Sequence, residues 1–286
     1  MGDLLFLSER DIRQAATMSE AIDWMAAAFE QLSSGEATVP LRMNMATPDG
    51  EFLLMPVALP RNQQLGVKAV SVWPSNPAAG LPLIHALLTI FDGKTGRPLA
   101  VMDGEYLTAL RTGAASGLAT RLCALPDAGV AAIFGAGAQA ATQLEAVCAA
   151  RPIRHAMVFG RSQQKAEAFC AEMTRQLGIP VTTTTNLADL KQADVICTAT
   201  TASRPLFAPE HVKPGAHINA VGAYRADMAE IPGALMARSR IIADQREGCL
   251  AEAGDIVQPM EAGLMTADQV AAELGEVSPR ASRSHE

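Results

Sequence analysis

Residues 130–162 read VAAIFGAGAQAATQLEAVCAARPIRHAMVFGRS. The apolar run Val130–Phe134 predicts a buried strand, and a helix-compatible segment follows it directly. A second apolar run, Ala156–Phe159, predicts another strand. Two strands joined by a helix over about thirty residues have the dimensions of a βαβ unit. The stretch therefore predicts an α/β domain built on a parallel sheet.

Three small residues lie at the turn from the first strand into the helix: Gly135, Gly137 and Ala140, in the pattern GxGxxA. In dinucleotide-binding folds the first glycine makes a tight turn, the second lets the backbone approach a pyrophosphate, and the third small residue packs the helix on the strand. The pyrophosphate binds the free N–H groups of the helix N-terminus. An ordinary glycine turn would also give this pattern, but its place between a strand and a helix favours a Rossmann-type dinucleotide-binding domain.

The end of the second strand indicates which dinucleotide is bound. NAD sites usually carry an acidic residue about 20 residues beyond the glycines, bonded to the ribose 2′-hydroxyl. Here that place reads Gly160-Arg161-Ser162, and the next acidic residue is Glu167. A guanidinium group pairs well with a phosphate. The sequence therefore favours NADP(H), with Arg161 and Ser162 at the 2′-phosphate, and leaves NAD(H) possible.

Composition narrows the function classes. Hydrophobic residues make up 49% of the 286 residues and charged residues 19%, which is typical of a globular protein with a sizeable core. The net charge of −7 argues against nucleic acid or an anionic membrane as the main partner. The five cysteines are scattered, which fits reduced thiols in a cytoplasmic protein better than disulfides or a metal site. An uninterrupted apolar run of about 18 residues, as a membrane span needs, is not found.

Before the nucleotide unit the pattern predicts an α+β domain. Ser8, with Asp11 three residues on, predicts the start of a short helix, and Ser19 is the expected cap of a second helix that Gly35 ends. Short strands separated by Pro and Gly follow, and then a long helix. The predicted strands are Arg42–Ala46, Glu51–Ala58, Gln64–Trp73, Ile84–Phe91 and Pro98–Met102, and the helix is Glu105–Cys123.

Three cations in this first domain stand on apolar faces. Strand alternation places Lys68 with Val70 and Val72, and helical spacing places Arg111 with Leu107 and Ala114. The third cation, Arg42, opens a strand on the face of Asn44 and Ala46. Each could pair with a carboxylate or reach water, because buried cations are rare unless paired. Together, beside a nucleotide site, they predict a pocket for an anionic substrate, most simply a carboxylate.

Beyond Ser162 the α/β alternation continues. The pattern predicts a helix at Gln163–Leu177 and further strands, and it suggests helical sequence near Thr266–Leu274. The strands are expected at Val181–Thr184, Asp194–Thr198, His217–Val221 and Arg240–Ala243. Thr200 and Gly222 follow two of these strands, at the edge where parallel sheets bind ligands.

The assembled chain resembles the ornithine cyclodeaminase/mu-crystallin family. The matching blocks are MDGEYLTALRTGAASGLAT at 102–120, GVKAV around Lys68, GLPLIHALLTIFDGKTGRPLAV, FGAGAQA, ADVICTATTASRPLF, HINAVGAY and AEAGDI. The resemblance implies a homodimer whose N-terminal domains pair, and a substrate site between the domains. The expected limits are 1–124 for the substrate-binding and dimerisation domain, joined by the segment 265–286, and 125–264 for the Rossmann-type domain.

The resemblance also implies site roles. Arg42, Lys68 and Arg111 match the substrate-carboxylate ligands. Separately from the resemblance, Lys68 is the candidate proton donor, because burial beside two arginines should lower its pKa, with a purely electrostatic role as the alternative. No metal is expected. The positions expected at the dinucleotide are Arg111, Thr112, Gly135, Gly137, Ala138, Gln139, Arg161, Ser162, Thr200, Val221 and Gly222.

One departure from the family pattern selects among activities. Cyclodeaminases of the family carry a catalytic aspartate where this chain has Tyr224, and Asp227 lies three positions away. The segment resembles members that reduce cyclic imino acids. The sequence therefore predicts an NADPH-dependent reductase of Δ1-pyrroline-2-carboxylate or Δ1-piperideine-2-carboxylate, acting on a small amino or imino acid. Ornithine cyclodeamination with bound NAD is the first alternative, and a non-catalytic NADP(H)-dependent binding protein of the mu-crystallin kind is the second.

Overall fold

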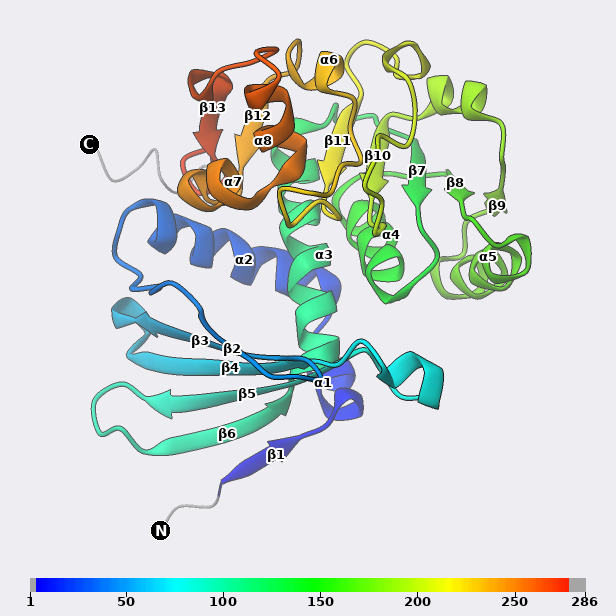
Figure 1. The fold of residues 1–286 in the computed structure, drawn as a ribbon. Coiled ribbons are helices and arrows are strands. Elements are labelled where there is room, and N and C mark those ends of the chain that lie inside the picture. Colours follow the sequence, from blue (N-terminus) through cyan, green and yellow to red (C-terminus); the bar gives the residue numbers. More distant parts are fainter. Residues whose placement is uncertain (1–3, 278–286) are drawn as a thin grey trace.

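The computed structural model describes residues 4–277. It contains a six-stranded sheet, a five-stranded parallel sheet and a two-stranded sheet, with helices packed on them (Figure 1). The six-stranded sheet comes first in the chain and the other two come after it. The predicted α/β class, with a Rossmann-type unit after an α+β unit, is confirmed.

The six-stranded sheet has the order β1-β6-β5-β4-β3-β2. Its strands are β1 (Leu5–Leu7), β2 (Met43–Ala46), β3 (Glu51–Leu59), β4 (Gln64–Val72), β5 (Ile84–Asp92) and β6 (Pro98–Asp103). Strands β2 to β6 pair antiparallel, and the predicted strands agree with them to within a residue at each end. Strand β1, which runs parallel to β6, is not among the predicted strands, because three residues are too short for a pattern.

Two short helices precede β2: α1 (Glu9–Ala15) and α2 (Met18–Ser33). Helix α1 begins with Ser8 and Asp11 bonded to each other's backbone N–H groups, as predicted. The expected cap of α2 at Ser19 is wrong, because Thr17 takes that role in a capping box with Glu20.

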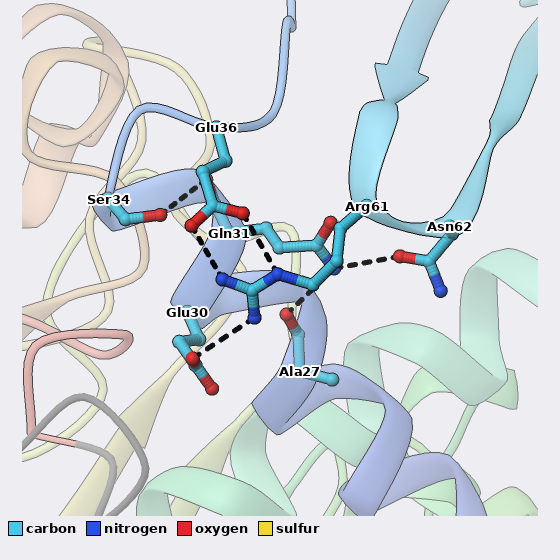
Figure 2. Close-up of polar contacts among 7 residues, drawn as sticks. All are labelled: Ala27, Glu30, Gln31, Ser34, Glu36, Arg61 and Asn62. Carbon is cyan, nitrogen blue, oxygen red and sulfur yellow. Dashed lines mark hydrogen bonds and ion pairs between the residues drawn. The ribbon is translucent and has the colours of Figure 1, made fainter. Parts of the chain in front are cut away.

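Polar side chains fasten the β3–β4 turn to the end of α2 (Figure 2). The Arg61 guanidinium pairs with the Glu36 carboxylate at 2.5 Å and with Glu30 at 3.2 Å. The Gln31 amide nitrogen donates to the Asn62 side-chain oxygen at 3.0 Å. Because the ion pairs are half-exposed, each adds little stability on its own, but together they hold the hairpin that carries β4.

Helix α3 (Gly104–Cys123) connects the two halves of the molecule: it starts at the six-stranded sheet and ends against the second unit (Figure 1). At its start, a Cβ on Gly104 would lie 2.7 Å from the Ala86 Cβ of β5. Further along, α3 packs on α4 (Ala138–Ala150), where a Cβ on Gly113 would lie 2.5 Å from the Thr142 carbonyl oxygen. The missing side chain of Gly113 therefore sets how closely the two helices approach.

The five-stranded sheet has the order β11-β10-β7-β8-β9, all parallel. Its strands are β7 (Val130–Phe134), β8 (His155–Phe159), β9 (Val181–Thr183), β10 (Val195–Thr198) and β11 (His217–Ala220). Helices α4 and α5 (Gln163–Leu177) pack on it through Leu144 and Met173, which are fully buried. The strand order reverses between β7 and β10, the place where open parallel sheets bind ligands.

The chain after β11 forms α6 (Gly233–Met236), β12 (Ile241–Ala243), α7 (Arg246–Glu252), α8 (Gly254–Glu261) and β13 (Val270–Glu273). The helix expected near Thr266–Leu274 is wrong, because only a short 3₁₀ turn forms before β13 pairs parallel with β12. The Ser33 hydroxyl of α2 donates to the Glu273 carboxylate at 2.7 Å, so this segment returns to the first half of the chain. Among the described residues, no helix has the length and apolar character needed to cross a membrane.

The α3–α4 contact gives a testable prediction. Gly113→Ala should lower the free energy of unfolding by about 1–3 kcal/mol, because the added methyl group overpacks the helix interface. Gly137→Ala is the control, since a Cβ there meets nothing within 4 Å. Urea unfolding of the cofactor-free protein measures both. A Gly113→Ala variant as stable as the control would show that the helices can separate without cost.

Candidate active site

The glycine turn after β7 has the backbone that a dinucleotide site requires. Gly135 has φ +113°, and a Cβ on it would lie 2.8 Å from the Ala199 carbonyl oxygen. Gly137 begins α4 without a side-chain cap, and open space surrounds its Cβ position. The first N–H groups of α4, at Ala138 and Gln139, therefore face no capping side chain and can donate to a phosphate. These observations fit a bound dinucleotide.

The loop after β10 lies beside this turn across the strand-order reversal, and the loop after β11 lies beside the β10 loop. A Cβ on Gly135 would approach the Thr200 Cγ2 atom to 3.8 Å. Val221 and Gly222 follow β11 directly, and the Val221 N–H donates to the Thr198 carbonyl at 3.0 Å. Thr200 and Gly222 both donate to the Glu230 carboxylate. The predicted positions Gly135, Thr200 and Gly222 thus lie close to one another at the strand-order reversal, where open parallel sheets have their ligand crevice.

Arg161 and Ser162 lie at the end of β8, on the other side of β7. The Ser162 hydroxyl caps α5 by accepting the Lys165 N–H at 3.4 Å. Arg161 is exposed, and within residues 4–277 neither a hydrogen bond nor an ion pair engages its guanidinium. The group is therefore accessible to an anionic ligand.

Helix α3 carries Arg111 and Thr112 to the N-terminal half of α4. The Thr112 hydroxyl donates to the Thr108 carbonyl at 2.7 Å, and the Gln143 amide donates to the Thr112 carbonyl at 3.3 Å. Gly113, the next residue, makes the close contact with α4. The α3–α4 packing therefore fixes where Arg111 and Thr112 stand relative to the glycine turn.

The three predicted cations act on one another. Burial lowers the pKa of Lys68 to about 8, and the positive charges of Arg111 and Arg42 add to the effect. Burial also lowers the pKa of Arg111, although its side chain keeps solvent-exposed surface, and the Asp244 carboxylate opposes this shift. The expectation of burial is right in part: Lys68 is half-buried, whereas Arg42 and Arg111 remain exposed.

Two acidic residues of the C-terminal segment face this cationic cluster, and the sequence did not indicate them. Glu252, in α7, pairs with Arg42 at 2.9 Å. Asp244, just after β12, accepts a hydrogen bond from the Cys249 thiol at 3.1 Å and lies near enough to Arg111 to affect its pKa. The AEAGDI block contains Glu252, so the family match could have pointed to it. The site therefore offers positive charge for the carboxylate of a zwitterionic ligand and acidic groups for its positively charged nitrogen.

Tyr224 occupies the position at which the family resemblance places the aspartate of cyclodeaminases. Its side chain is 58% exposed. Asp227 is paired with Arg225 at 3.0 Å, and this interaction lowers the pKa of the Asp227 carboxyl group. Asp227 is therefore an ion-paired surface carboxylate, which makes it a poor substitute for the missing aspartate as a base.

The glycine turn lies on a doubly wound parallel sheet, and α3 joins this sheet to another that bears the cationic cluster. Together these features define the class: a two-part protein that binds a nicotinamide dinucleotide. The model of the ornithine cyclodeaminase/mu-crystallin family matches residues 3–281, so the chain belongs to this family. The family resemblance and the Rossmann-type fold are thereby confirmed.

Similar proteins match nearly the whole chain. A Δ1-pyrroline-2-carboxylate reductase of Bacillus cereus is 36% identical over 96% of this chain and 85% of its own. The mouse ketimine reductase mu-crystallin is 33% identical over 98% of this chain and 88% of its own. The structure of the Thermococcus litoralis Δ1-pyrroline-2-carboxylate reductase, in complex with NADH and L-proline, superposes with a TM-score of 0.91 at 39% identity, covering 97% of this chain and 87% of that one.

Proposed function

We propose that the protein reduces cyclic imino acids such as Δ1-pyrroline-2-carboxylate to the cyclic amino acid, with NADPH as its preferred cofactor. The observation that carries the proposal is the proximity of Lys68, Arg42 and Arg111, of which α3 carries Arg111 to α4, the helix that begins at the glycine turn. The relatives described above support the imine substrate. The ion-paired Asp227 and the tyrosine at 224 argue against cyclodeamination.

The proposed roles follow from charge. The three cations bind the substrate carboxylate and so fix the neighbouring imine carbon, and this positioning makes hydride transfer effectively intramolecular. The bound nicotinamide supplies the hydride. Lys68 gives a proton to the imine nitrogen, because a group with a pKa of about 8 is protonated at neutral pH and still a competent acid.

This role predicts a pH dependence. Lys68 is charged below its pKa of about 8, so kcat/KM for imine reduction should fall as the pH rises through about 8. Lys68→Arg should lower kcat/KM and remove this fall, because a guanidinium keeps its charge but does not release its proton at these pH values. Lys68→Met should lower kcat/KM by about 10²–10⁴-fold, the range for a positioned proton donor.

The exposed Lys94 provides the control, since Lys94→Arg should leave the pH profile unchanged. Titration of the substrate is common to all variants, so only the enzyme group can shift the profile. A Lys68→Arg profile that coincides with the wild-type profile would assign the proton to another donor.

The NADPH preference rests on Arg161 and on the absence of an acidic residue before Glu167. Arg161→Ala should weaken NADPH binding by about 1.5–3 kcal/mol, the range for a hydrogen bond to a charged group, and change NADH binding far less. Arg154→Ala, at the other end of β8, is the control. Calorimetric titration with both cofactors measures the difference. Equal losses for NADPH and NADH would contradict the assignment.

We also propose that two copies pair through the outer face of the six-stranded sheet, the face opposite Lys68. Strand register places Met43, Leu54, Ala69 and Leu87 in one row across this face. Met43 is 64% exposed and Leu87 55% exposed, and Phe6 adds to the same face. A contiguous apolar surface of this kind marks a protein interface.

Leu87→Glu should therefore give a monomer, because two charges would be buried without partners in the dimer interface. Leu125→Glu, at an exposed leucine elsewhere, should leave the dimer intact. Sedimentation equilibrium distinguishes the two states. A dimeric Leu87→Glu variant would place the interface on another surface.

A further inference from the structure

A fully buried carboxylate joins the two loops that close the far side of the dinucleotide crevice. Glu230 has no exposed surface. Its Oε1 atom accepts the Thr200 N–H at 2.7 Å and the Thr200 hydroxyl at 2.6 Å, and its Oε2 atom accepts the Gly222 N–H at 2.7 Å. Thr200 follows β10 and Gly222 follows β11, so a single side chain bridges the ends of two neighbouring strands.

Gly222 packs closely against both Thr200 and Glu230. A Cβ on Gly222 would lie 2.3 Å from the Thr200 carbonyl oxygen and 2.5 Å from the Glu230 carboxylate, so only glycine fits there. The two backbone groups that meet the carboxylate are donors, and the Thr200 hydroxyl donates as well. An ionised carboxylate, which only accepts, satisfies all three, and hydrogen bonds to a charged acceptor are the strong ones.

Hydrogen bonds to its own backbone groups hold Glu230 in place. The Asp255 Oδ1 atom accepts the N–H groups of Glu230 and Ile231 at 2.7 and 2.9 Å. The Glu230 carbonyl accepts the Leu206 N–H at 2.9 Å. Asp255 is 4% exposed and belongs to the AEAGDI block. Asp255 thus holds the backbone at Glu230, and the Glu230 carboxylate in turn holds the Thr200 and Gly222 loops.

These loops face the side of the crevice away from Arg161. Thr200 approaches the glycine turn across the β7–β10 boundary, whereas Arg161 stands at the end of β8. In Rossmann-type domains the β8 side takes the adenosine half of the dinucleotide, so the Thr200 and Gly222 loops take the nicotinamide half.

We propose that Glu230 is a positioning residue, whose carboxylate fixes the spacing of the Thr200 and Gly222 loops and so the surface against which the nicotinamide half binds. Only the expected effect on catalysis rests on the proposed reductase function. The effects on the loops and on dinucleotide binding do not depend on it. Loss of the carboxylate should loosen both loops, weaken the nicotinamide half of the dinucleotide and slow hydride transfer, while the adenosine half binds as before.

Glu230→Gln tests this with nearly the same shape, because the amide NH₂ group must face one of the donors. In the cofactor-free variant, amide hydrogen exchange at residues 200–202 and 222–224 should accelerate. Affinity for adenosine 2′,5′-bisphosphate should stay within a few-fold of wild type, whereas affinity for NADPH falls. The rate of imine reduction should fall by up to about 100-fold, the cost of misplacing reacting groups by an ångström. Glu210→Gln, an exposed acidic residue in the same half, is the control.

Thr200→Val and Thr200→Ser provide a second pair if Glu230→Gln does not fold. Valine removes the hydroxyl donor and keeps the shape, and serine keeps the donor, so serine should retain wild-type loop protection and valine should lose it. Unchanged loop exchange in Glu230→Gln, or equal losses for NADPH and the bisphosphate, would overturn the proposal. A wild-type protein that reduces no imine would instead refute the reductase function, and the exchange and binding data would still decide the role of Glu230.

Discussion

The close packing of α3 on α4 is the contact on which the site depends. Gly113 lets the backbone of α3 approach Thr142 of α4, whereas Gly117 makes room for Ile22 of α2 and, less closely, for Ala146 of α4. Because α3 begins on the six-stranded sheet and α4 begins at the dinucleotide turn, this one interface sets the distance between the cationic cluster and the crevice. Arg111 and Thr112 lie just before it on α3. A shift of the helices would therefore move the anion site and the cofactor site relative to each other.

Electrostatics explains how three cations can lie near one another in this protein. Three cations from separate elements would repel one another, and the depressed pKa of Lys68 records both this repulsion and its burial. Glu252, paired with Arg42, and Asp244, near Arg111, offset part of the charge. The cluster remains able to receive a carboxylate, since Arg42 and Arg111 are exposed. The acidic neighbours add a complementary charge for the nitrogen of an imino or amino acid.

Local sequence patterns predicted the elements whose signals are themselves local. The βαβ unit at 130–162, helix α5 and the antiparallel strands were predicted because apolar periodicity and turn residues define them within a short window. The sequence could also have identified Thr17 as the cap of α2. Thr17 and Glu20 have the spacing of a capping box, whereas the residue three positions after Ser19 is Ile22, which cannot complete one. Strands β1 and β13 are short and pair in parallel with distant partners, so neither carries a pattern of its own.

The site was predictable to a similar degree. The glycines stand out because they lie at a strand-to-helix turn, and the three cations because they interrupt apolar patterns. Glu230 gave no such signal: its donors lie 30 and 8 residues away, and a glutamate between Ala229 and Ile231 reads as an ordinary strand or loop residue. Asp244 and Glu252 were missed for the same reason, since their partners belong to the first half of the chain.

Transfer of labelled hydride tests the central claim, that the cationic cluster presents an imine carbon to the nicotinamide. The protein is incubated with Δ1-pyrroline-2-carboxylate and NADPH that carries deuterium at both C4 positions of the nicotinamide, and the proline formed is analysed by NMR. Hydride transfer to the imine carbon predicts deuterium at the α-carbon of proline in proportion to the cofactor oxidised. Proline without deuterium, or no cofactor oxidation together with stoichiometric ammonia from ornithine and NAD, would contradict it.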